Sequence, residues 1–97
     1  MNLIACDAHD CRETAAELIL KSVGEDLQRE GLQRTPERFA RAIREVCSGY
    51  SQTLAEVIGK GVFPAEGKGL VVVKDIELYS MCEHHMLPFS GKASVAY

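Results

Sequence analysis

The chain has 97 residues, of which 46% are hydrophobic and 26% are charged, and its formal net charge is −3. This length suits one small domain, which buries about 65% of the surface of its unfolded chain and is only modestly stable by itself. The acidic balance provides no extended positive field, so we expect neither a nucleic-acid partner nor a membrane surface. No apolar stretch approaches the roughly 20 residues that cross a bilayer, and the start of the chain lacks a basic segment followed by an apolar one. We therefore expect a cytoplasmic protein.

The expected redox state of the cysteines depends on the cellular compartment of the protein. Without a secretory signal, an oxidising environment has no support, so free thiols or metal ligands are favoured over disulfides. The four cysteines are Cys6, Cys11, Cys47 and Cys82.

Residues 10–31 have the pattern of a capped helix. Asp10 and Glu13 have the acid-x-x-Glu spacing of a capping box, and apolar residues then recur at helical intervals as far as Leu27. The pattern predicts a helix from 11 to 29, ended by Gly31.

A second helix is predicted to begin at Thr35-Pro36, which offers a hydroxyl N-cap and a proline at the first helical position. Apolar residues fall on one face as far as Tyr50, and Gly49 lies where a C-terminal cap is wanted. Residues 53–58 are expected to add one or two more helical turns.

The character of the sequence changes after Gly67. Residues 70–80 are rich in β-branched and aromatic side chains and predict a strand. A second strand is expected at 92–97. A two-stranded hairpin is marginal in water, so its partners belong to further sequence or to another subunit. The predicted fold class is α+β, with helices followed by the first antiparallel strands of an incomplete sheet.

Between the two predicted strands, a thiol, a carboxylate and two imidazoles occupy four consecutive positions, 82–85. Cys82 and His85 are three residues apart, and a tight bend can direct both at one Zn²⁺ while His84 stays free. Catalytic zinc usually has three protein ligands and a water whose pKa it lowers to around 7. A single Cys-x-x-His is by itself more often incidental than metal-binding, so two ligands do not define the site.

Two separated segments, in order, resemble type I GTP cyclohydrolases. One is Gly-Leu-x-x-Thr-Pro-x-Arg at 31–38. The other, at 75–97, is Asp-Ile-Glu-Leu-Tyr-Ser-Met-Cys-Glu-His-His, followed by Leu-Pro-Phe and Gly-Lys-Ala-x-Val-Ala-Tyr. Two motifs in register are far more specific than either alone. Over about residues 12–97, the chain resembles the amino-terminal part of the members of this family.

The resemblance implies roles for four residues. Cys82 and His85 are implied zinc ligands, and His84 is the implied proton donor and acceptor. Arg38 matches an arginine that the family uses on the substrate triphosphate, although an exposed arginine paired with Glu37 or Glu45 is its ordinary interpretation. Glu83 is expected only to support the ligands.

The implied reaction is hydrolytic opening of the guanine ring of GTP at C8. It releases formate and gives dihydroneopterin triphosphate, the first step of folate and pterin biosynthesis and a part of one-carbon metabolism. The family also implies a homo-oligomer, commonly a decamer, and a tunnelling fold (T-fold). On this basis we expect a mobile extension at 1–10, a helical region at 11–66 and the start of the T-fold sheet, with the Cys-Glu-His-His motif, at 67–97.

The sequence departs from the family in what it lacks. The third zinc ligand of the family, a cysteine, and its guanine-binding glutamate occur beyond the position of Tyr97. The segment Cys6-x-x-His9-x-Cys11 is a local alternative for metal binding, although a mobile extension is the plainer interpretation. Cys47 is expected to be a small buried hydrophobe, and the two methionines beside the motif, Met81 and Met86, are expected to pack. A truncated, non-catalytic assembly or metal-binding module is the alternative function.

Overall fold

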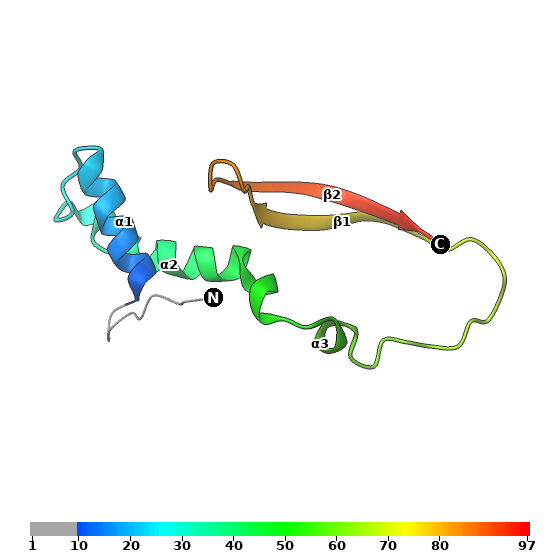
Figure 1. Ribbon diagram of the computed structural model, residues 1–97. Coiled ribbons are helices and arrows are strands. Elements are labelled where there is room, and N and C mark those ends of the chain that lie inside the picture. The colour runs from blue at the N-terminus through cyan, green and yellow to red at the C-terminus, as the bar shows by residue number, and fades with distance from the viewer. Residues whose placement is uncertain (1–9) are drawn as a thin grey trace. The chain divides into compact units, whose positions relative to one another are not determined.

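A computed structural model describes residues 10–97 and has an α+β arrangement, with helices followed by two antiparallel strands (Figure 1). The chain divides between Glu45 and Val46 into two compact units. The elements, in order, are α1 (Cys11–Ser22), η1 (Glu30–Leu32), α2 (Thr35–Val46), η2 (Ser48–Ser51), α3 (Leu54–Ile58), β1 (Val72–Met81) and β2 (Pro88–Ala96).

Helix α1 begins where the sequence predicts and ends earlier. The Asp10 carboxylate accepts a hydrogen bond from the Arg12 amide at 2.9 Å and so caps the helix. The helix ends at Ser22, because Gly24 adopts a φ of 89° that only glycine takes readily. The prediction of a helix to residue 29 is therefore wrong, since Gly24 and not Gly31 ends it.

Helix α2 begins at Thr35, as predicted, and ends at Val46. The Thr35 hydroxyl donates to the Gly31 carbonyl oxygen at 3.4 Å. The predicted N-cap role of Thr35 is therefore wrong, since Thr35 is the first helical residue and its hydroxyl acts as a donor to the preceding turn. Tyr50 lies in the short 3₁₀ helix η2 and not on α2 as the periodicity predicted. The apolar face of α2 is thus shorter than the sequence pattern indicates.

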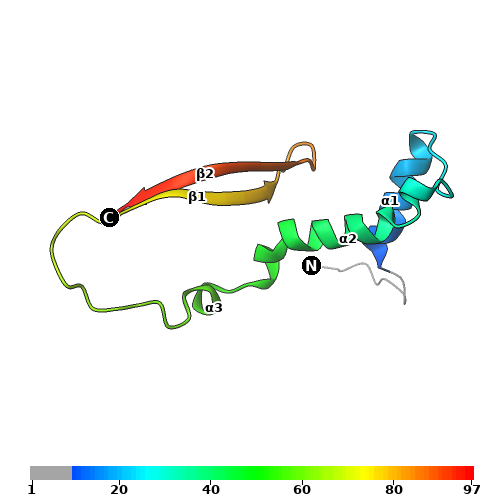
Figure 2. The same cartoon turned by 180° about the vertical axis from the view of Figure 1, so that it is seen from behind.

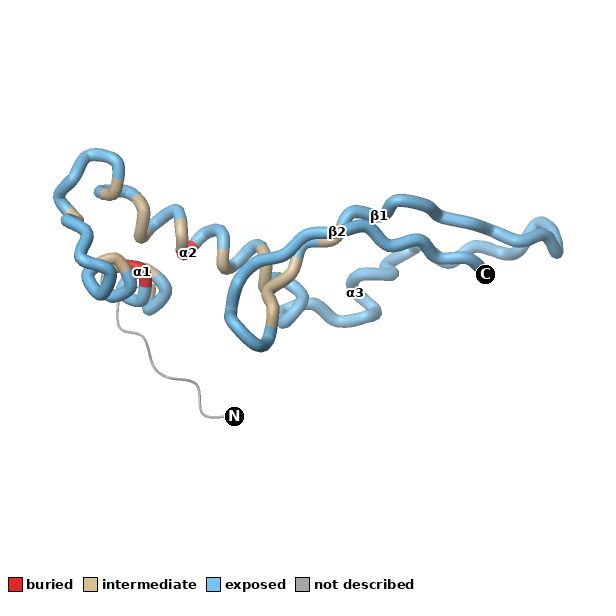
Figure 3. Tube along the Cα trace, turned by 90° about the horizontal axis from the view of Figure 1, so that it is seen from above, coloured by how far each residue is buried: buried red, intermediate tan, exposed pale blue. Residues whose placement is uncertain are grey.

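The first unit is held by small side chains and by ion pairs. Only Ala16 on α1 and Ala40 on α2 are buried among residues 10–97 (Figure 3). The capping residue Asp10 also pairs with Arg12 and with Arg44 in the last turn of α2. One carboxylate therefore accepts from an amide at the start of α1 and also links that helix to α2 by an ion pair.

Helix α3 is a single short element with a complete capping box. The Glu56 amide donates to the Thr53 hydroxyl at 3.2 Å, and the Thr53 amide donates to the Glu56 carboxylate at 2.8 Å. Gly59, with a φ of 52°, ends the helix. The helical turn predicted at 53–58 is confirmed.

Strands β1 and β2 form an antiparallel hairpin, visible from opposite sides in Figures 1 and 2. The register pairs Val72 with Ala96 and Met81 with Pro88, and it is interrupted between Val73 and Ile76. Inside this bulge, Asp75 has a φ of 55° and its amide donates to the Ser94 hydroxyl at 3.2 Å. The second strand starts at Pro88, four positions before the predicted 92, because the ladder continues up to the connecting turn.

The alternation of side chains gives the hairpin one apolar face. Since paired residues share a face and the bulge shifts the alternation, this face carries Val73, Ile76, Leu78, Phe89, Ala93 and Val95. Most of these side chains are exposed, Val95 at 50% and Phe89 at 49%.

Within residues 10–97, no helix is long and apolar enough to cross a membrane.

The cap of α1 gives the first testable prediction. Replacing Asp10 by Ala removes the cap acceptor, and we expect the free energy of unfolding to fall by about 1 kcal/mol, measured by urea denaturation with circular dichroism at 222 nm. Asp10→Asn keeps a cap acceptor and loses only the exposed ion pairs, so it should retain most of the stability. Equal losses in the two variants would show that the ion pairs, and not the cap, stabilise this unit.

Candidate functional site

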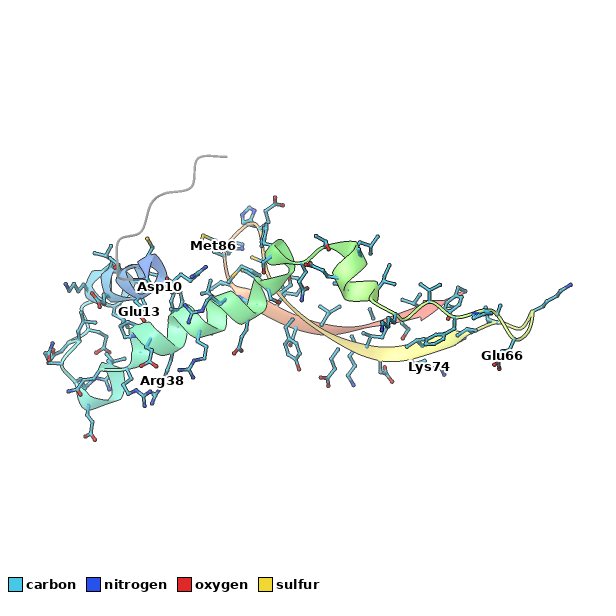
Figure 4. All side chains as sticks on the ribbon, turned by 90° about the horizontal axis from the view of Figure 1, so that it is seen from below. Asp10, Glu13, Arg38, Glu66, Lys74 and Met86 are labelled. Atoms are coloured by element: carbon cyan, nitrogen blue, oxygen red, sulfur yellow. The ribbon has the colours of Figure 1, made fainter. Side chains whose placement is uncertain are left out.

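The candidate site is the turn that joins β1 to β2. The Cys82 amide donates to the Leu87 carbonyl oxygen at 2.8 Å and so continues the strand ladder into the turn. The Met86 amide donates to the Cys82 carbonyl oxygen at 3.0 Å, closing the loop one residue earlier. Met86 lies in this connection in Figure 4. These bonds return the chain within a few residues, so side chains from both sides of the bend come close together.

Cys82 and His85 bring two side chains of the metal-ligating type close together in this turn. The Cys82 Sγ lies 3.9 Å from the His85 Nδ1 and accepts a hydrogen bond from the His85 amide at 3.1 Å. In a tetrahedral zinc site, with Zn–S near 2.3 Å and Zn–N near 2.0 Å, the two donor atoms are about 3.6 Å apart. The donor chemistry and this separation fit one zinc ion, with a shift of a few tenths of an ångström.

His84 lies beside the pair and differs from it in environment. Its ring centroid is 4.3 Å from that of His85, with the planes tilted by 54°. Its side chain is exposed, as is that of Glu83. An imidazole that is accessible and next to two potential ligands is suited to moving protons.

Backbone amides surround the Cys82 thiol. The amide of Leu87 is the largest influence, followed by that of His85, and together they lower the pKa of Cys82 below the ordinary value of a cysteine. Desolvation opposes them, and the amides of His84 and Met86 add smaller effects in the same direction as Leu87. Lowering the pKa favours the thiolate, which is the form that binds metals.

The turn borders an open hollow within the second unit, with a volume of about 600 Å³. Cys47 is a free cysteine that lines this hollow together with Cys82. Its side chain is half-buried, and not fully buried as the sequence predicts. Tyr50, which is 95% exposed, and Glu83 also line it. The hollow places an accessible aromatic ring and a carboxylate on the walls of a cavity that reaches Cys82.

Arg38 is exposed on α2 in the first unit (Figure 4). The expected ion pair between Arg38 and Glu37 does not form. The Glu37 carboxylate instead contacts Arg34 at 3.5 Å and Arg41 at 3.1 Å. Within residues 10–97, the Arg38 guanidinium has no carboxylate partner. It borders a surface hollow that Arg34 and the carboxylate-bearing Glu30 also line, and its exposed guanidinium offers five donors to a ligand.

A third protein ligand is not found in the described part of the chain. Among residues 10–97, no cysteine, histidine, aspartate or glutamate joins Cys82 and His85 in a group that could hold a metal ion. The alternative set includes Cys6 and His9, which lie outside the described residues. Cys11 is disulfide-bonded, so the expectation of a free thiol or metal ligand is wrong at that position.

One feature of the turn could not be found by sequence reasoning. Met86 has a φ of 55°, a left-handed conformation that is uncommon for a residue with a side chain. Glycine and asparagine carry the sequence signal for such a conformation, and methionine carries none.

Comparison with known proteins identifies the family. The family model for GTP cyclohydrolase I matches residues 12–97. GTP cyclohydrolase 1 of Deinococcus radiodurans is 65% identical over 78 residues, which cover 80% of this chain and 36% of that protein. A GTP cyclohydrolase 1 of Pseudomonas putida is 58% identical over 81% of this chain and 42% of its own length, and that of Teredinibacter turnerae is 54% identical over 89% and 48%.

The fold and the turn define an α+β protein with a Cys-x-x-His pair in the connection between its two strands. The chain belongs to the GTP cyclohydrolase I family, as the resemblance of its two motifs predicted. It spans less than half the length of the curated relatives named above.

The lowered pKa of Cys82 is testable by alkylation. Only the thiolate reacts, so the rate rises with pH through the pKa of the thiol. A lowered pKa therefore predicts that alkylation of Cys82 by iodoacetamide reaches half of its maximal rate at a lower pH than alkylation of N-acetylcysteine amide. The measurement is mass spectrometry of the Cys82 peptide in the Cys47→Ser variant. An equal or higher midpoint would contradict the influence of the turn amides.

Proposed function

We propose that this chain carries part of the active site of a zinc-dependent GTP cyclohydrolase I, which opens the guanine ring of GTP and gives dihydroneopterin triphosphate and formate. The observation that carries the proposal is the 3.9 Å separation of the Cys82 Sγ and the His85 Nδ1, with the His84 ring beside them. Membership of the family supplies the substrate, since the relatives are named GTP cyclohydrolases.

Cys82 and His85 are the residues that would hold Zn²⁺. The backbone amides that lower the pKa of Cys82, that of Leu87 first, shift its ionisation toward the thiolate, the form that binds metals. When bound, the metal acts as a Lewis acid and makes a coordinated water more acidic. The protein supplies the two donors on one short turn, which limits the chain entropy lost when both are ordered around the ion.

His84 is proposed to move the protons of the reaction. Hydrolysis adds water at C8 of the guanine, opens the five-membered ring at that carbon, and in a second hydrolytic step releases C8 as formate. A ring nitrogen must gain a proton as the bond to C8 breaks. An exposed imidazole adjacent to the ligands can donate that proton and later accept one from water.

Arg38 is proposed to bind the triphosphate. Its guanidinium is planar and permanently charged, and it lies in the first turns of α2, where the helix dipole favours anions. The absence of a carboxylate partner among the described residues leaves its donors accessible to phosphate oxygens.

The proposed setting is a homo-oligomer of T-fold subunits in the cytoplasm, a decamer in the family's common form. The apolar face of the hairpin, with Phe89 and Val95 about half exposed, favours burial against further strands or helices.

The proposal is tested by assaying this chain beside a chimera that continues from Tyr97 into the remaining sequence of the Deinococcus radiodurans relative. Formate release and pterin fluorescence from GTP report turnover, and bound zinc is measured in parallel. We expect His85→Ala to lose zinc and activity together. His84→Ala should keep zinc and lower kcat by about 10²- to 10⁴-fold.

Loss of zinc from both histidine variants would contradict the separate role of His84. A chimera that binds zinc and GTP but releases no formate would contradict the catalytic proposal. That outcome would favour the alternative, a metal-binding or assembly module derived from the family.

Arg38 has a matched control on the same helix. Replacing it by Ala should raise KM for GTP about tenfold or more, because charged hydrogen bonds to phosphate are lost. Arg41 pairs with Glu37 at 3.1 Å, and Arg41→Ala should change KM less than twofold by comparison. Equal effects of the two substitutions would show a general influence of positive charge and not a phosphate contact.

A further inference from the structure

Met86 is one of two residues other than glycine with a positive φ among residues 10–97, the other being Asp75. At a φ of 55°, the Cβ of an L-residue crowds its own backbone, so this conformation is unfavourable unless the surroundings impose it. Strained backbone of this kind is concentrated at functional sites.

The side chain of Met86 does not account for the strain. It is 77% exposed, so the packing role expected from the sequence does not hold for the described residues. A residue that gains little from burial and still adopts an unfavourable φ is held there by its backbone bonds. The Met86 amide donates to the Cys82 carbonyl oxygen at 3.0 Å.

That bond determines the geometry of the metal-ligating pair. It closes the turn from Cys82 to Met86, and the next residue, Leu87, accepts from the Cys82 amide at 2.8 Å as the chain enters β2. Residues 83–85 form the turn, and the left-handed residue at 86 follows them, where the chain leaves the turn toward β2. With the reversal in place, His85 directs its amide at the Cys82 Sγ at 3.1 Å, and its Nδ1 lies 3.9 Å from the same sulfur.

We propose that Met86 is a positioning residue for the metal, whose left-handed backbone holds Cys82 and His85 at the separation of ligands to one ion. This inference rests on the proposed zinc site and adds to it a residue that is not itself a proposed ligand. Its effect passes through backbone conformation, so it depends on which side chains tolerate a positive φ and not on the thioether.

The test replaces Met86 by residues that differ in this tolerance. Glycine and asparagine adopt the left-handed region readily, whereas a β-branched valine does not. The 97-residue chain is titrated with Co²⁺, and the thiolate-to-cobalt charge-transfer band in the near ultraviolet reports binding at Cys82. We expect Met86→Gly and Met86→Asn to bind within about threefold of the parent and Met86→Val to bind about tenfold more weakly.

Asp75 supplies a matched control, because it has the same φ of 55° in the bulge of β1. Asp75→Val introduces the same backbone conflict into the hairpin away from the turn, and it should leave cobalt affinity within about threefold of the parent. Cys82→Ser should remove the band. Circular dichroism of the two valine variants checks that the hairpin is retained to a similar extent.

The outcomes separate this inference from the proposed function. If Met86→Val binds cobalt as tightly as the parent, the positioning role is overturned while the metal site stands. Equal weakening by Met86→Val and Asp75→Val also overturns it, since the cause is then general destabilisation of the hairpin. If the parent chain gives no charge-transfer band, the metal site itself is rejected and this inference fails with it.

Discussion

The proposed metal site of this chain depends on the chain reversal between β1 and β2. Two strands that pair up to Met81 and Pro88 leave a connection of only six residues, and its backbone bonds fix where each side chain emerges. The Cys82 sulfur accepts from a turn amide and lies near the His85 ring. The same amides lower the pKa of Cys82. A single local constraint therefore sets both the spacing of the two donors and the ionisation of one of them.

The remainder of the second unit gives this turn little support. A two-stranded hairpin is marginally stable in water, and the apolar face of β1 and β2 is largely exposed. The relatives that the chain matches are more than twice as long as the aligned segment. Burial of Phe89 and its neighbours by further structure would stabilise the strands, and with them the geometry at Cys82. The proposed metal ion would act in the same direction, because an ion held by Cys82 and His85 would stabilise the folded turn relative to the open chain.

Much of this arrangement could be predicted from local sequence patterns. The capped start of α1, the Thr-Pro start of α2 and the β-branched run of β1 each carry a short-range signal, and each element forms. The early end of α1 was missed, because Gly24 and Gly31 are both plausible stops and the periodicity continues to Leu27. The early start of β2 at Pro88 was missed because proline is a weak strand signal, although it is tolerated at the first position of a strand.

The candidate site was predicted in its residues and not in its geometry. The Cys-x-x-His spacing and the family motif indicate Cys82, His84 and His85, but the left-handed backbone at Met86 has no signature in a methionine. Arg38 forms no ion pair with Glu37, because the neighbouring Arg34 and Arg41 pair with that carboxylate instead. Such choices among equivalent exposed partners differ by little free energy, so sequence spacing does not decide them.

The central claim is that Cys82 and His85 bind the same metal ion while His84 remains unbound. Zinc K-edge X-ray absorption of the zinc-loaded chain tests it most directly. We predict one sulfur scatterer at about 2.3 Å and one imidazole nitrogen at about 2.0 Å, with lighter atoms completing the coordination. A shell without sulfur, or one with two imidazoles, would contradict the account.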